Sequence, residues 1–341
     1  MQRMPIITMD AATPYERGVQ YGEQAKEQID IALSYYKRKF SKKFRWKEIV
    51  DFAERFDDVT QKFSADAMNE IRGIADGSGH DVREIMTINA RYELSQFDWQ
   101  HECTTGVFID NKEHNKFIFK NCDLAKEVKN HLVILHIIRP DGLRALGVAE
   151  AGQLVRDGFN NFGIALVNSA LRSGMDYSGI AVPGTVIRKK IWESKSFAEA
   201  CNIQRNCFRT VSTNMLIAST EGIAVDFECY PGGEDEVLPK NKIIATGNRF
   251  TIKPSRNRAI DPAIDRGIQL RNLLENQDNN INLEVLMNIL KNHEGYPESI
   301  CRHADEIGHT TVYSIIINLT DCKVYICFGN PCSNAYEEYV L

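Results

Sequence analysis

The spacing of apolar residues changes near residue 100, and this change limits the folds open to the chain. Before that point, the apolar residues of Arg17–Phe40 and Gln61–Ala75 recur at helical spacing. Asp81, with Glu84 three residues later, indicates the start of a further helix. After Cys103 the apolar period becomes two, which is typical of strands. The sequence therefore predicts a helical first part followed by sheets.

The rest of the chain contains further blocks of strands and helices. Polar turn clusters separate strands predicted over Thr104–Asp110, Lys116–Asn121, His131–Arg139, Leu143–Glu150 and Gly163–Asn168. Helices are predicted over Thr185–Asn206, with a break at Lys195–Ser196, and over Asp261–Glu275 and Asn282–Asn292. Hairpins are predicted over Asn214–Ser219 with Gly222–Glu228, and over Thr310–Leu319 with Lys323–Gly329. Short turns imply antiparallel sheets, so the pattern predicts a large α+β domain with helices outside two stacked sheets.

Composition excludes several classes of protein. A content of 43% apolar and 26% charged residues is globular, and the net charge of −5 argues against a nucleic-acid binder. The longest apolar runs are far short of the about 18 residues of a membrane helix. The opening MQRMPIITMDAATP lacks the plan of a secretory signal, and the nine cysteines contain no CxxC pair. We expect a reduced cytoplasmic protein that binds neither nucleic acid nor membrane.

Cys103 is the first candidate for chemistry because it lies at the change of period, among polar neighbours. A buried cysteine is usually a small apolar residue of the core. A catalytic cysteine needs a base, because its thiolate is the nucleophile. The α-amine of the cysteine itself can serve, if the chain is cut before it.

Motifs along nearly the whole chain resemble the penicillin acyltransferase-like group of N-terminal nucleophile hydrolases, peptidase family C45. They are Glu16-Arg17-Gly18, Gly22, Gly73-Ile74-Ala75, Gly77-Ser78-Gly79, Asn89-Ala90-Arg91-Tyr92-Glu93, Cys103-Thr104-Thr105, Asn121-Cys122-Asp123, Gly163–Asn168, Gly247-Asn248-Arg249-Phe250, Ile300-Cys301-Arg302-His303, Gly329-Asn330-Pro331-Cys332 and Tyr339. No single motif is specific, but their order and distances together make a strong match.

The resemblance implies a four-layer αββα sandwich and a precursor that cleaves itself between Glu102 and Cys103. Residues 1–102 would become a helical chain and residues 103–341 the catalytic chain, together forming one domain, so the N-terminal fragment is an expected partner. The penicillin enzymes have glycine before the nucleophile, where this chain has Glu102. Glycine eases the strained peptide of an N-to-S acyl shift, so a glutamate either slows the cut or assists it as a local base.

The resemblance also implies the catalytic roles. The Cys103 thiol would attack an acyl carbonyl, with its freed α-amine as the base. Asp123 would hold that amine in place. Asn248 would donate to the developing oxyanion, and Asn168 would supply a second donor.

Two further residues complete the implied site. Arg302 would lie near the thiol and favour the thiolate. Tyr92, on the last helix before the cut, is a candidate substrate contact, although core packing is the simpler role. Cys301, His303 and His309 can also be read as a metal site, but their spacing fits no standard zinc pattern, so no metal is expected.

The implied function is an amidohydrolase or acyltransferase that acts on a small linear amide or acyl thioester through a thioester on Cys103. Water or an amine would resolve that thioester. Coenzyme A, if used, would be a substrate, and no bound cofactor is expected. Two alternatives remain open. One is an uncleaved, non-catalytic binding protein on the same fold, and the other is a conventional enzyme that pairs Cys103 with His303 or His101.

Overall fold

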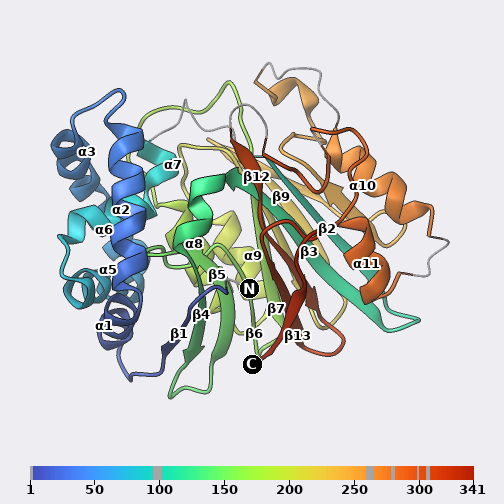
Figure 1. Cartoon of the computed structure of the whole chain (residues 1–341), viewed down its shortest axis with the longest axis horizontal. Coiled ribbons are helices and arrows are strands. Elements are labelled where there is room, and N and C mark those ends of the chain that lie inside the picture. Colours follow the sequence, from blue (N-terminus) through green and yellow to red (C-terminus); the bar gives the residue numbers. More distant parts are fainter. Residues whose placement is uncertain (1–2, 95–101, 259–264, 278–280, 298, 305–307) are drawn as a thin grey trace.

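Two β-sheets lie face to face, with helices on the outer side of each (Figure 1). The computed structural model describes residues 3–94, 102–258, 265–277, 281–297, 299–304 and 308–341. The layers follow the order helices, sheet, sheet, helices. The expected four-layer αββα sandwich is confirmed.

The first sheet has eight strands in the order β1-β4-β5-β6-β7-β8-β9-β10. Their bounds are β1 Ile6–Met9, β4 Leu132–Ile138, β5 Arg144–Glu150, β6 Asp157–Asn160, β7 Ile164–Ala170, β8 Thr213–Ser219, β9 Ala224–Tyr230 and β10 Gly233–Val237. All neighbours are antiparallel except β1 and β4, which are parallel. The start of the chain therefore forms the edge of a sheet whose other strands come much later in the sequence.

The second sheet has six antiparallel strands in the order β11-β2-β3-β12-β13-β14. Their bounds are β11 Ile243–Thr246, β2 Glu102–Asp110, β3 Asn115–Ala125, β12 His309–Asn318, β13 Lys323–Phe328 and β14 Tyr336–Val340. Strand β2, which carries Cys103, is held between β11 and β3, so both of its edges are paired.

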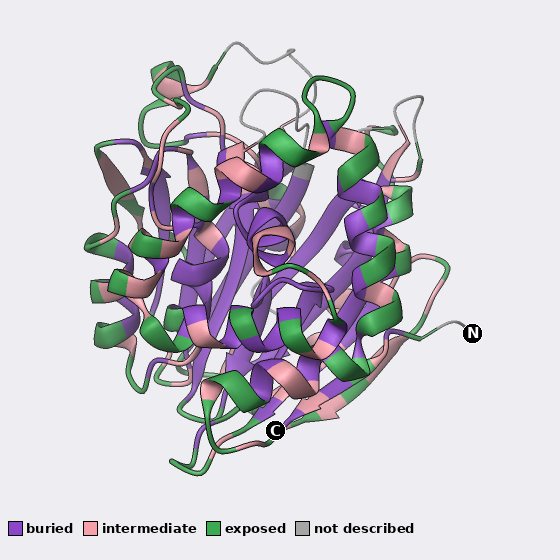
Figure 2. Cartoon of the chain, turned by 90° about the vertical axis from the view of Figure 1, so that its left-hand side faces the viewer, coloured by how far each residue is buried: buried purple, intermediate pink, exposed green. Residues whose placement is uncertain are grey.

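Nine of the described α-helices lie on the side of the first sheet and two on the side of the second (Figure 1). The nine are α1 Pro14–Gln24, α2 Lys26–Phe40, α3 Trp46–Ala53, α4 Asp57–Phe63, α5 Ala65–Ser78, α6 Val82–Asn89, α7 Arg91–Leu94, α8 Gly184–Trp192 and α9 Phe197–Arg205. The two are α10 Arg266–Glu275 and α11 Leu283–Ile289. Short 3-10 turns are η1 Glu54–Phe56, η2 Lys126–His131 and η3 Pro254–Arg256. Figure 2 shows exposed residues on the outer helix faces and buried strands behind them.

Apolar side chains join the layers. On the outer face of the second sheet, Phe108, Phe119 and Ile316 form one cluster with Leu270 of α10 and Leu286 of α11. A larger cluster joins the N-terminal helices to both sheets. Burial of this apolar surface holds the four layers together.

Two glycines of the family motifs allow α1 and α5 to pack closely. A Cβ on Gly18 would lie 2.2 Å from the carbonyl oxygen of Glu70, and one on Gly73 would lie 2.0 Å from that of Tyr15. Any larger residue would push the two helices apart.

The structure divides one helix that the sequence predicts as continuous. Arg17–Phe40 spans the end of α1 and all of α2, which are separated at Ala25. The apolar spacing continues across this break, so the pattern does not reveal it. The predicted break at Lys195–Ser196 is confirmed between α8 and α9. Among the described residues, no helix combines the length and apolar character that crossing a membrane requires.

Candidate active site

Cys103 is the second residue of β2, and strand pairing decides what surrounds it. Thr105 of β2 is opposite Thr246 of β11, so Asn248, two residues beyond Thr246, lies alongside Cys103. On the other edge, Cys103 is directly opposite Cys122. The pairing of β2 therefore gathers three separate motifs around one residue.

The amide of Asn248 bridges two backbones. The backbone N–H of Cys103 donates to Asn248 Oδ1 at 2.5 Å, and Asn248 Nδ2 donates to the carbonyl oxygen of Ala170 at 2.7 Å. An NH₂ group has two hydrogens, so one N–H of Asn248 remains for a further acceptor. The predicted proximity of Asn248 to Cys103 is thus present in the structure.

Asp123 is fully buried and accepts two side-chain hydrogen bonds. Arg266 donates to Oδ2, and Thr311 Oγ1 donates to Oδ1 at 2.6 Å. Burial raises the pKa of Asp123 to about 7, against the opposing charge of Arg266 and the Thr311 hydrogen bond. Asp123 is also the strand partner of Glu102, so it stands opposite the residue before Cys103.

Arg266, which was not predicted from the sequence, connects Asp123 and Asn248. Besides its ion pair with Asp123, its guanidinium lies 3.4 Å from Asn248 Oδ1. Arg266 is the first residue of α10, where a positive charge opposes the helix dipole. A basic residue at that position was a weak signal of a role outside the helix.

The thiols of Cys103 and Cys122 form a buried pair between the sheets. The Cys103 thiol donates to Cys122, and that hydrogen bond, together with burial, raises the pKa of Cys103 well above its usual value. Burial also acts to raise the pKa of Cys122, but the hydrogen bond and the charges of Lys120 and Arg156 lower it to about 6. Arg156 donates to Cys122 Sγ at 3.7 Å. The charges of Lys120 and Arg156 therefore favour ionisation of Cys122 over that of Cys103.

Lys120 and Arg156 belong to a buried network of charges that was not predicted from the sequence. Lys120 Nζ lies 2.7 Å from Asp157, and Arg156 pairs with Glu150 at 2.5 Å. Asn168, the predicted second oxyanion donor, also faces this network. With its amide turned so that the nitrogen faces these acceptors, Asn168 Nδ2 donates to Asp157 Oδ1 and to the carbonyl oxygen of Arg156, each at 3.2 Å.

The backbone of Arg302 is hydrogen-bonded to a residue that contacts Asp123. Its N–H donates to Thr311 Oγ1 at 2.9 Å, and that hydroxyl in turn donates to Asp123. The Arg302 side chain is 2% exposed. The effect of its charge on the Cys103 thiol stays a prediction.

Two cavities lie near Asn248. A narrow one, with about 20 Å³ of free space, is lined by Tyr92, Glu93, Arg188 and Ala170, whose carbonyl accepts from Asn248. A larger one of about 380 Å³ is lined by Gly247 and Arg249, which flank Asn248, and by residues at the start of α10. It is within the range of about 300–1,000 Å³ that is typical of small-molecule sites.

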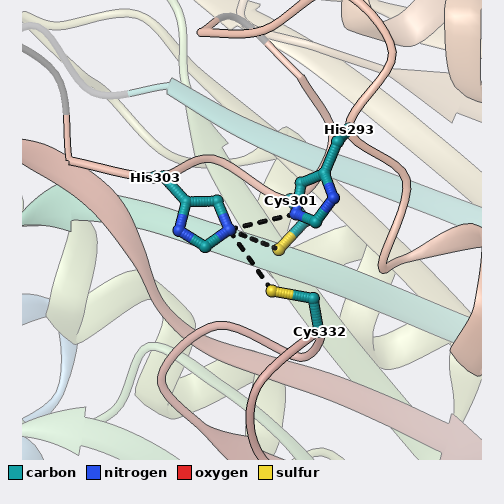
Figure 3. Close-up of side chains that lie close together, drawn as sticks. All are labelled: His293, Cys301, His303 and Cys332. Atoms are coloured by element: carbon teal, nitrogen blue, oxygen red, sulfur yellow. Dashed lines mark hydrogen bonds between the residues drawn. The ribbon is translucent and has the colours of Figure 1, made fainter.

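A second group of cysteines and histidines lies apart from this site. His303 contacts His293, Cys301 and Cys332 (Figure 3). The sequence grouped Cys301 and His303 with His309 as a conceivable metal site, whereas in the structure Cys301 and His303 lie with His293 and Cys332. His101, the other histidine considered as a base, lies outside the described residues.

The sequence matches a known family over residues 110–333, described as acyl-coenzyme A:6-aminopenicillanic acid acyl-transferase. The matched region contains Asp123, Asn168, Asn248 and Arg302 and begins after Cys103. No curated protein matches the sequence.

Similar solved structures are distant. A Caenorhabditis elegans N-acylethanolamine-hydrolyzing acid amidase ortholog has a TM-score of 0.48 and 15% identity, over 70% of this chain and 100% of that one. A mutant conjugated bile acid hydrolase from Clostridium perfringens has a TM-score of 0.42 and 14% identity, over 70% and 97%. Penicillin V acylase from Agrobacterium tumefaciens has a TM-score of 0.43 and 11% identity, over 66% and 83%. The family match covers more than half of the chain, so this protein belongs to the acyl-coenzyme A:6-aminopenicillanic acid acyl-transferase family.

Proposed function

We propose that the chain is a self-processing cysteine N-terminal nucleophile enzyme that acts on a linear amide or an acyl thioester. One observation carries the proposal. The backbone nitrogen of Cys103 donates to Asn248, and Arg266 links Asn248 to the buried Asp123. A cut before Cys103 would turn this backbone nitrogen into an α-amine already held at the site.

The cut requires a base before any α-amine exists. We assign that role to Cys122, which is hydrogen-bonded to the Cys103 thiol and stabilised as a thiolate by Arg156 and Lys120. Cys122 takes the thiol proton while the Cys103 sulfur attacks the carbonyl carbon of Glu102. The C–N bond then breaks, the nitrogen receives the proton that Cys122 took up, and a thioester links Glu102 to the Cys103 sulfur. Water hydrolyses this thioester and leaves chains 1–102 and 103–341.

The cut chain then has its own base. The Cys103 α-amine, with a pKa of about 8 for an ordinary N-terminus, accepts the thiol proton as the sulfur attacks a substrate acyl group. Asp123 holds the amine, and Arg266 keeps Asp123 and Asn248 in fixed relative positions. Arg302 adds positive charge that favours the Cys103 thiolate.

The remaining N–H of Asn248 is the donor for the oxyanion of the tetrahedral intermediate. Asn168 is the proposed second donor, although its amide faces Asp157 and Arg156 in the intact chain. Collapse of the intermediate expels the amine or thiol of the substrate. Water or an acceptor amine then releases the acyl group from Cys103.

The larger cavity beside Asn248 supports a small-molecule substrate. Arg249 and Arg271 line it together with the apolar Phe250, Val237 and Ile268, so one part suits an anionic or polar group and another an acyl chain. Tyr92, in the narrow cavity, is the proposed second substrate contact. All nine cysteines lie in the described part of the chain and none forms a disulfide there, and we propose a reducing compartment such as the cytoplasm.

Intact-mass measurement and N-terminal sequencing of the purified chain test the proposal. We expect two fragments of roughly 12 and 27 kDa, in proportion to residues 1–102 and 103–341 of the 38.7 kDa chain, the larger beginning with Cys103. Cys103→Ala should leave one full-length chain, while Cys322→Ser, at an exposed cysteine, should cleave normally. A wild-type protein that stays whole, or a Cys103→Ala chain that is cut at the same bond, would show that the proposal is wrong. The first result would favour a non-catalytic binding protein.

A further inference from the structure

Four side chains with metal-binding atoms meet at one point, although they come from three separate segments (Figure 3). His293 follows α11, Cys301 and His303 precede β12, and Cys332 lies between β13 and β14. Their ligand atoms all lie within 4.8 Å of one another. His303 Nε2 lies 3.0 Å from His293 Nε2, 3.3 Å from Cys332 Sγ and 4.0 Å from Cys301 Sγ.

These distances are close to those of a tetrahedral zinc site. With Zn–N bonds of about 2.0 Å and Zn–S bonds of about 2.3 Å, tetrahedral geometry places two nitrogens about 3.3 Å apart and two sulfurs about 3.8 Å apart. A nitrogen and a sulfur would be about 3.5 Å apart. The separations of 3.0 and 3.3 Å lie within about 0.3 Å of these values, and that of 4.0 Å lies within about 0.5 Å. No two of the ligand atoms are more than 4.8 Å apart, so side-chain movements of up to about 1 Å would complete the site.

We propose that His293, Cys301, His303 and Cys332 bind one zinc ion in a closed structural site. Two thiolates and two imidazoles are a standard ligand set for zinc, and four protein ligands leave no open position for chemistry. The ion replaces the two thiol protons, which leave to solvent, so the loaded cluster has no net charge.

Neighbouring donors suit bound thiolates. Asn330 Nδ2 lies 3.8 Å from Cys301 Sγ, and Ser333 Oγ lies 3.3 Å from Cys332 Sγ. Donors of this kind stabilise and orient metal ligands in known sites. Cys301 is fully buried, whereas His293 is exposed, so the ion can enter from the His293 side.

The position of the cluster indicates what the ion does. Arg302 lies between two of the ligands, and its carbonyl oxygen accepts from Asn330 Nδ2 at 2.6 Å and from the backbone N–H of Thr311 at 2.9 Å. A zinc ion would fasten the segment before β12 to the loop before β14 and so hold Arg302 against Thr311. This structural role does not depend on the proposed catalytic activity.

Zinc content of the full-length chain tests the site. The protein is produced with added zinc, dialysed and analysed by elemental mass spectrometry. We expect about one zinc ion per chain, and a near-complete loss in Cys332→Ser and in His293→Ala. Because His293 is exposed, the second variant should keep its fold, which circular dichroism checks. Cys322→Ser is the matched control and should keep its zinc, as should Cys103→Ala, because that variant disables only the proposed catalytic site.

Cobalt provides a second readout. Cobalt(II) added to the metal-free chain should give sulfur-to-cobalt charge-transfer absorption in wild type and in Cys322→Ser but not in Cys332→Ser. A wild-type chain that holds no zinc and gives no such absorption would overturn the proposal. So would retention of zinc by both ligand variants, or a disulfide between Cys301 and Cys332 in freshly purified protein.

Discussion

The molecule contains two pairs of neighbouring cysteines with very different surroundings. Cys103 and Cys122 lie on the neighbouring strands β2 and β3, close to the charged side chains of Arg156 and Lys120. Cys301 and Cys332 lie between loops, next to two imidazoles. Nearby cations stabilise a free thiolate, which suits a nucleophile and its base. Imidazoles and thiolates can bind the same metal ion, so the surroundings of Cys301 and Cys332 suit a structural metal site. The neighbours of a cysteine, more than the cysteine itself, decide its role.

The largest expected difference between the pairs concerns self-cleavage. Cys122→Ser removes the proposed base and should slow the cut at Glu102–Cys103 by about 10²–10⁴-fold, the usual contribution of a positioned base. Once cut, the chain uses its α-amine, so turnover should change far less. Cys332→Ser, from the other pair, should leave the rate of the cut within tenfold of wild type.

The appearance of the smaller fragment over time, followed by intact mass, measures this effect. A Cys122→Ser chain that is cut at the wild-type rate would remove Cys122 from the mechanism. It would leave the proposed roles of Cys103, Asp123 and Asn248 in place.

A second comparison concerns the asparagine beside each pair. Asn248→Ala removes the oxyanion donor and should lower kcat by about 10²–10³-fold. Asn330→Ala removes a donor to Cys301 and should weaken zinc binding by about 10–100-fold with much less effect on kcat. Steady-state kinetics and zinc competition titrations measure the two effects. Similar losses of kcat in both variants would mean that the two regions do not act separately.

The smallest effect is expected at Thr311, which connects the regions. Its hydroxyl accepts from Arg302 and donates to the Asp123 carboxylate. Burial raises the pKa of Asp123 to about 7. The proposed mechanism uses the ionised carboxylate, so activity should increase as the pH rises through about 7. Thr311→Val removes a hydrogen bond worth about 1.5–3 kcal/mol to the charged form, so this pKa should rise further, by about one to two units.

The pH dependence of kcat/KM measures this shift toward higher pH. Thr311→Ser keeps the hydroxyl and should retain the wild-type profile. An unchanged profile in Thr311→Val would show that ionisation of Asp123 does not limit activity.

Much of the fold could be predicted from the sequence because most strands carry a clear two-residue apolar period. The exceptions are short or irregular strands. No strand was predicted over Asp157–Asn160, but this segment forms β6, where Asp157 is buried as the partner of Lys120. Ile6–Met9 is too short to give a period, and its pairing with β4 depends on a residue more than a hundred positions away.

The site was predictable to the extent that its residues lie in motifs. Cys103, Asp123 and Asn248 meet because β2 pairs with the strand that carries Asp123 and with the strand that precedes Asn248. The contacts that Arg266 and Cys332 make were not predictable, because the sequence of each segment does not indicate which residue of another segment it meets. Only the three-dimensional arrangement brings Arg266 to Asp123 and Cys332 to His303.

The parallel pairing of β1 with β4 has a consequence for how the molecule would unfold. A cut before Cys103 would turn this pairing into an interface between two subunits, along with the buried Arg91–Glu150 and Glu70–Lys189 ion pairs. The intact precursor unfolds as one molecule, so its stability does not depend on concentration. The cut protein would dissociate as it unfolds, so each tenfold dilution would lower its apparent free energy of unfolding by about 1.4 kcal/mol. The same fold would thus change from a unimolecular to a bimolecular equilibrium through the loss of one peptide bond.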